Sequence, residues 1–76
     1  MREKVERKKR VFGVMLAGER LEAGMTQFEL ADASGACRST LASWECGLNF
    51  PRIDSLVRLA DALGKEVQIR FVEKEG

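Results

Sequence analysis

The sequence predicts a mainly α-helical domain of four to five helices that ends in a single β-strand. Apolar residues recur at helical spacing through most of the chain, and strict alternation appears only near the C-terminus. The chain has 76 residues, 45% of them hydrophobic, and one Pro, which indicates one folded domain near the lower size limit for a self-sufficient core. We divide it into a basic arm (1–10), a helical domain (11–64) and a C-terminal strand with its tail (65–76).

Residues 1–10 carry a strong positive charge. Six Lys and Arg stand there against two Glu, a net charge of +4, whereas the rest of the chain has a net charge of −3. A basic end can follow phosphate groups, although a solvated helix end or a frayed terminus has the same composition. Lys and Glu are good helix formers, so the arm either continues the first helix backwards or forms a separate segment.

The first helix is predicted over Val11–Gly24. Phe12, Leu21 and either Met15 or Leu16 have the spacing of one helix face, which we expect to pack on the core. The glycine at position 24 fits a helix end, because glycine readily adopts the left-handed conformation found there.

The second helix is predicted from Thr26 to about Ala33. Thr26 and Glu29 have the spacing of a capping box, in which each side chain accepts a hydrogen bond from the backbone of the other residue. Its apolar positions are Leu30, Ala31 and either Phe28 or Met25.

A sharp turn at Gly35 separates this helix from a third one, predicted over Cys37–Glu45. We expect Leu41 and Trp44 to face the core, and Gly47 to end the helix. Small residues such as Ala31 at the crossing allow the two helices to approach closely. The outward-facing side chains of the third helix are then short, except for Arg38. A helix of this kind fits the DNA major groove, which is about 12 Å wide.

After a connecting loop, Pro51 precedes a fourth helix, predicted over Arg52–Leu63 and ended by Gly64. An apolar stripe runs along this helix, formed by Ile53, Leu56, Leu59, Ala60 and Leu63.

The stretch "KEVQIRFVEK" then alternates apolar and polar residues, as a strand does. A lone strand leaves its backbone unpaired, and the simplest partner is the same strand of a second copy, antiparallel across a two-fold axis. An unpaired extended tail is the alternative. The residues assigned to this dimer strand are Val67, Gln68, Ile69, Arg70 and Phe71.

The segment "GMTQFELADASGACRSTLASWECG", followed by a proline and by "LVRLADALG", resembles the Cro/repressor (XRE-type) helix-turn-helix family. The resemblance covers about Leu16 to Leu63 and implies a λ-repressor-like fold that binds DNA. The tail "LGKEVQIRFV" is also similar to antitoxins of the HipB-like and HigA-like kind, whose last strand pairs across a dimer.

The resemblance to the repressor family implies roles for individual residues. Positions that read base edges correspond to Arg38, Ser39 and Ser43, and the arginine has the geometry to bind guanine O6 and N7. Positions that hold DNA phosphates correspond to Thr26, Gln27, Thr40, Asn49 and Arg52. The family often joins the first and third helices by a salt bridge, here between Arg20 and Glu45, which we expect to be structural.

Both cysteines depart from the family pattern. Cys37 replaces the usual Ser or Thr cap of the third helix, and a thiol is a poorer acceptor; Cys46 stands where a polar or basic residue commonly meets phosphate. If both lie on one helix they are about 13 Å apart along its axis, too far for a disulfide. Without histidine, a zinc site would require carboxylates or a second chain, so we expect two ordinary thiols and leave oxidation sensitivity open.

We therefore expect a homodimeric, sequence-specific DNA-binding regulator, a repressor, which reads an inverted repeat. Two alternatives remain: the antitoxin of a toxin–antitoxin operon, which would also bind a toxin, and a protein-interaction module without DNA binding. We expect no enzymatic activity, cofactor or metal, because histidine, a Gly-rich phosphate loop and a cleft with paired carboxylates are missing. No signal peptide or membrane-spanning run is apparent, so a cytoplasmic, nucleoid-associated location is expected.

Overall fold

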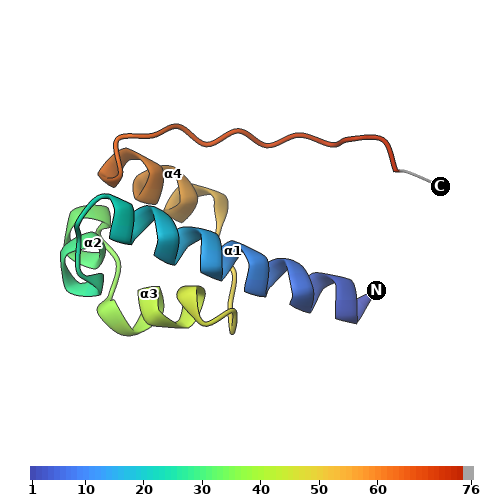
Figure 1. Cartoon of the computed structure of the whole chain (residues 1–76), viewed down its shortest axis with the longest axis horizontal. Helices are drawn as coiled ribbons and strands as arrows, with labels where there is room; N and C mark the ends of the chain where they lie inside the picture. Colours follow the sequence, from blue (N-terminus) through green and yellow to red (C-terminus); the bar gives the residue numbers. More distant parts are fainter. Residues whose placement is uncertain (75–76) are drawn as a thin grey trace.

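A computed structural model describes residues 1–74 and shows four helices in that range: α1 (Arg2–Glu22), α2 (Gln27–Ser34), α3 (Arg38–Glu45) and α4 (Ile53–Ala62). The long α1 crosses the middle of the molecule, with α3 on one side of it, α4 on the other and α2 at its C-terminal end (Figure 1). The prediction of a mainly helical domain is confirmed, with four helices.

α1 starts nine residues earlier than the predicted start at Val11, since it begins at Arg2 and has 21 residues. The basic arm is thus the N-terminal half of α1. Two contacts help to hold this half: the rings of Phe12 and Phe50 lie 4.7 Å apart, and Lys9 pairs with Glu6 one turn away at 3.5 Å. Within residues 1–74, no helix is both long and apolar enough to cross a membrane.

The core lies where α1, α2, α3 and α4 meet. Its buried apolar residues are Leu16, Leu30, Ala31, Leu41, Trp44 and Leu59. Two residues predicted to be apolar core positions, Leu21 and Ile53, are exposed instead. Of the alternatives left open, Leu16 rather than Met15 is buried, and Met25 rather than Phe28 packs against the core. For Leu21 the reason is the rotation of α1: the helix turns Gly13 and Leu16 inward, and Leu21 lies about 140° around the helix from Leu16.

The predicted capping box at the start of α2 is confirmed. The hydroxyl oxygen of Thr26 accepts a hydrogen bond from the backbone N–H of Glu29 at 3.0 Å, and the Glu29 carboxylate accepts one from the backbone N–H of Thr26 at 2.8 Å. Two N–H groups that would otherwise lack partners are thereby satisfied.

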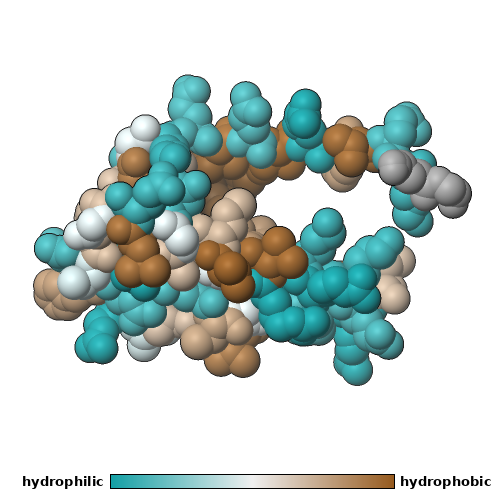
Figure 2. Space-filling view, viewed as in Figure 1, coloured by the Kyte–Doolittle hydropathy of each residue, from teal (hydrophilic) through white to brown (hydrophobic). Residues whose placement is uncertain are grey.

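The C-terminal segment differs most from the expectation. Residues 65–74 are extended but form no strand with any part of residues 1–74, because a ladder needs a second strand and the described chain offers none. Lys65 ties the start of this tail to α1 through Glu19, with 2.8 Å between Nζ and Oε1. The tail then runs back antiparallel to α1, and open space separates it from the N-terminal half of that helix (Figures 1 and 2). Pairing with a second copy stays a prediction.

Candidate nucleic-acid interface

The turn between α2 and α3 depends on Gly35. This residue has φ 75°, a left-handed conformation that side chains disfavour, and it ends α2 while the chain reverses direction. The next backbone N–H, of Ala36, donates to the carbonyl of Ala31 at 2.9 Å, which closes the turn. Leu41 and Trp44 then face the core, as predicted, so the opposite side of α3 faces solvent.

α3 also lies directly against α1, and Gly13 makes this contact possible. A β-carbon at Gly13 would lie 2.5 Å from the carbonyl oxygen of Glu45 and 2.7 Å from that of Trp44. Such distances are below any normal contact, so only glycine permits this approach without a shift of backbone. The sequence reasoning did not single out Gly13; its one available signal was a glycine beside the predicted core face of the first helix.

A charged network fixes the C-terminal end of α3. Arg20 donates to both carboxylate oxygens of Glu45, with Nε–Oε2 at 2.7 Å and Nη2–Oε1 at 3.1 Å, and donates from Nη1 to the carbonyl of Met25 at 2.9 Å. The Arg20 and Glu45 side chains are only 12% and 7% exposed. The structure therefore contains the predicted ion pair, in bidentate form and largely withdrawn from solvent.

Gln27 belongs to the same network, because its Nε2 donates to Oε1 of Glu45 at 3.0 Å. Burial disfavours the charged form of Glu45, but the hydrogen bonds from Arg20 and Gln27 and the charge of Arg20 outweigh burial, so the pKa of Glu45 lies below its ordinary value. In turn, the hydrogen bond to Glu45 raises the pKa of Arg20. Both groups remain ionised and hold α1, α2 and α3 in one arrangement.

The outward face of α3 carries the residues assigned to base edges. Arg38 and Ser39 in the first turn are exposed, and Ser43, one turn after Ser39, is half-buried. Arg38 forms no ion pair with any group of residues 1–74, so its five N–H donors are available. Asn49, from the following loop, donates from Nδ2 to the Ser43 hydroxyl at 2.6 Å, and the structure thus joins a predicted base contact to a predicted phosphate contact.

The other residues assigned to phosphates have different surroundings. Thr40 is exposed on α3, and Arg52 is exposed beside Asp54, at 3.5 Å between their charged atoms. Thr26 is exposed, but its backbone N–H is used by its own capping box. The side chain of Gln27 donates to Glu45, while its backbone N–H lies in the first turn of α2; the phosphate contact of this residue stays a prediction.

Arg58 is a residue that the sequence reasoning missed. It stands on α4, yet it lines a shallow cavity at the N-terminal end of α3 together with Cys37, Thr40 and Ser55. The backbone N–H groups at that helix end carry partial positive charge, and Cys37 forms no side-chain cap there. Arg58 donates to the Ser55 hydroxyl at 3.4 Å and lies 3.9 Å from the Asp54 carboxylate, which partly neutralises its charge. A cation beside hydroxyls at an uncapped helix N-terminus has the chemistry to meet a DNA phosphate. The sequence does not reveal this placement, because Arg58 follows the end of the predicted third helix by 13 positions and belongs to another helix.

Both cysteines are free and exposed, Cys37 at the beginning of α3 and Cys46 at its end. Among the described residues, no group of three or more His, Cys, Asp or Glu side chains comes together in a way that could hold a metal ion. The Cys37 side chain accepts no capping hydrogen bond from the first turn of α3, as expected because a thiol is a poor acceptor.

Comparison with known proteins gives one clear result. No curated protein matches the chain. The profile of a helix-turn-helix family matches residues 16–69, which includes α2, α3 and α4 and the C-terminal third of α1. On this match, and with a turn and an exposed second helix of the required form, the chain belongs to the Cro/C1-type (XRE) helix-turn-helix family and contains a DNA-binding domain of that kind.

Proposed function

We propose that the chain is a sequence-specific transcriptional repressor in which α3 enters the major groove of duplex DNA. The observation that carries this proposal is the contrast between the two ends of α3: its C-terminal end is held by Arg20 and Glu45, while Arg38 and Ser39 at the other end are exposed. A rigidly held helix with free donors suits direct readout of base edges, with Arg38 on guanine. Repression follows from occupation of a promoter.

The active form in this proposal is a homodimer on an inverted repeat, with half-sites about one helical turn apart. The tail supports dimerisation, because Ile69, Phe71 and Val72 expose most of their surface although they are apolar. Val67 and Ile69 line a groove of about 400 Å³ between α1, α4 and the tail. Antiparallel pairing of two tails would satisfy the backbone groups of both and cover these side chains.

A protein-interaction module is the second candidate, and the charge distribution favours it. Outside residues 1–10 the chain has a net charge of −3, and Arg52 near the proposed interface is partly neutralised by Asp54. The antitoxin hypothesis combines both activities, since it adds a toxin as partner to operator binding.

Selection from random duplex DNA, followed by titration of the selected sequence across salt concentrations, tests the proposal. We expect enrichment of a palindrome, a steep fall of affinity with salt, and a loss of discrimination of about 1–3 kcal/mol at one base position in Arg38→Ala. Lys74→Ala, which removes the same charge from the exposed tail, serves as the control and should leave the preferred sequence unchanged. Absence of any enriched sequence would contradict the proposal and favour the interaction module.

A further inference from the structure

The outer face of α1, which points away from the core, is apolar over three turns. Val11, Val14 and Leu21 are 60%, 73% and 65% exposed, and Gly18 lies between them. Spacings of three and four residues align these four residues, which we call the α1 stripe, along one side of the helix. Apolar side chains gather over the middle of α1 on the face shown in Figure 2. An exposed helix face in a small domain is ordinarily polar, so this stripe requires an explanation.

No part of residues 1–74 covers the α1 stripe. The opposite side of α1 holds Gly13 and Leu16 against α3 and the core, and the tail lies along a third side, where Met15 and Glu19 line the groove with it. The whole arm, Val11 and Val14 precede the segment that matches the helix-turn-helix family, which begins at residue 16, whereas Gly18 and Leu21 lie within it. The stripe therefore begins before the matched segment and continues into it.

We propose that the α1 stripe binds the α1 stripe of a second copy, with the two helices antiparallel. Gly18 has open space around it, and a β-carbon there would meet nothing within 4 Å. When the two helices cross near residue 16, Val14 of one copy lies over Gly18 of the other, and Val11 lies over Leu21. A large residue opposite a glycine lets the helices approach closely, as knobs do in the holes of a coiled coil.

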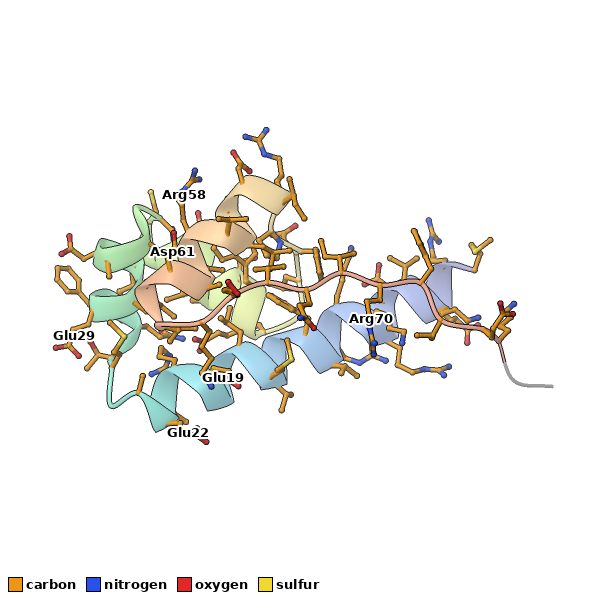
Figure 3. The ribbon with its side chains drawn as sticks, turned by 90° about the horizontal axis from the view of Figure 1, so that it is seen from above. Glu19, Glu22, Glu29, Arg58, Asp61 and Arg70 are labelled. Atoms are coloured by element: carbon orange, nitrogen blue, oxygen red, sulfur yellow. The ribbon has the colours of Figure 1, made fainter. Side chains whose placement is uncertain are left out.

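Charges along one side of the stripe favour the antiparallel orientation. Lys8 lies beside the stripe near the N-terminus of α1, and Glu22 lies on the same side of the helix near its C-terminus. Figure 3 shows Glu22 at the end of α1, directed away from α4. The hydrogen bond and charge of Glu19 raise the pKa of Lys65 at the start of the tail, and the charge of Glu22 adds to this effect. Antiparallel pairing brings Lys8 of each copy beside Glu22 of the other. Parallel pairing would instead place the two +4 arms side by side, which costs energy through repulsion.

The same arrangement is compatible with DNA binding. In Figure 1, α3 lies on one side of α1, and α4 and the tail lie on the opposite side. A two-fold axis that runs from the tail side to the α3 side, perpendicular to α1, makes the α1 helices antiparallel and keeps both α3 helices on one face of the pair. This point rests on the proposed function, because it concerns how a pair joined through α1 meets DNA. The α1 contact is distinct from the tail pairing described above, and it does not depend on DNA.

A charge-swap experiment on the full chain tests the contact. Sedimentation equilibrium without DNA gives the self-association constants of the wild type, Lys8→Glu, Glu22→Lys and the double variant. We expect each single reversal to weaken association about tenfold, because two symmetric pairs become repulsive, and the double variant to recover to within about threefold of the wild type. Asp61→Lys makes the same charge change as Glu22→Lys, but at an exposed site on α4. It is the matched control for that variant and should have no effect on association. Val14→Lys should weaken association more than either reversal.

Recovery in the double variant distinguishes a contact between copies from an effect inside one chain. Positions 8 and 22 are 14 residues apart, about 21 Å along a helix, too far to interact within one molecule. Additive losses, or a wild type that stays monomeric at all concentrations, would overturn the inference. If DNA selection still gives a palindrome in that case, the proposed function stands and only the α1 contact is wrong. If the swap restores association but no DNA sequence is enriched, the contact stands and the proposed function fails.

Discussion

Substitution of Gly13 by alanine tests how α1 and α3 are held together. The new β-carbon would lie 2.5 Å from the Glu45 carbonyl oxygen, whereas ordinary contact begins near 3.4 Å, so about 0.9 Å of separation (3.4 minus 2.5) is needed. This oxygen and the Trp44 carbonyl oxygen, 2.7 Å away, both belong to the backbone, so no side-chain rotation relieves the clash. A gap of that size also loses a quarter to a half of the dispersion energy of the contacts around it.

The expected magnitude follows from two opposing effects. Overpacking costs about 1–3 kcal/mol, and a clash with backbone lies at the upper end of that range. Alanine is favoured over glycine inside a helix by about 1 kcal/mol. We therefore expect Gly13→Ala to lower the free energy of unfolding by about 2 kcal/mol, which corresponds to a fall in Tm of about 8–16 °C for a domain of this size.

Gly18→Ala is the matched control, because it lies on the same helix and has open space around it. Within one chain only the helix propensity acts there, and we expect a gain of about 0.5–1 kcal/mol in the stability of the monomer. Urea unfolding followed through the fluorescence of Trp44, the single tryptophan, compares the two variants, at two protein concentrations to separate folding from self-association. Equal stability of Gly13→Ala and Gly18→Ala would refute the proposed close approach of α1 and α3.

Two further predictions concern the helix cap and the charged network. Thr26→Ala should lower the free energy of unfolding by about 1 kcal/mol, while Cys37→Ala should leave it nearly unchanged, because only Thr26 makes a side-chain cap; equal losses in urea titrations would contradict this. The pKa of Glu45 is lowered in the folded state, so the stability that this carboxylate contributes is present above its unfolded pKa and is lost as the pH falls through its folded pKa. Unfolding measured from pH 7 to pH 3 should show a smaller acid-induced loss in Glu45→Gln than in the wild type, and identical pH profiles would argue against the Arg20–Glu45 pair.

Local signals accounted for the parts of the structure that depend on neighbours in sequence. The capping box of Thr26 and Glu29 set the start of α2, and the glycine at position 35 set the turn, because both effects act within four residues. Leu41 and Trp44 could be assigned to the core because a helix of known phase has one apolar side there. The ion pair of Arg20 with Glu45 was expected from the family resemblance, not from spacing.

Other features could not be read from the sequence, because they depend on contacts between distant segments. The rotation of α1 exposes Leu21, a choice made by the approach of Gly13 to α3 rather than by the local pattern. Gln27 donates a hydrogen bond to Glu45, and Arg58 reaches the beginning of α3 from α4. The predicted strand is an extended tail in the single chain, because its hydrogen-bonding partner would have to come from another molecule.

The sequence by itself determined the mainly helical class, the sharp turn between α2 and α3, and the family, since propensity, capping and glycine conformation act over a few residues. The tertiary structure alone decided which side of α1 is buried, because the close backbone contact between Gly13 and α3 fixes the rotation of that helix. It also decided that the apolar surface of α1 remains uncovered in one chain. That surface is therefore where we expect a second copy to bind.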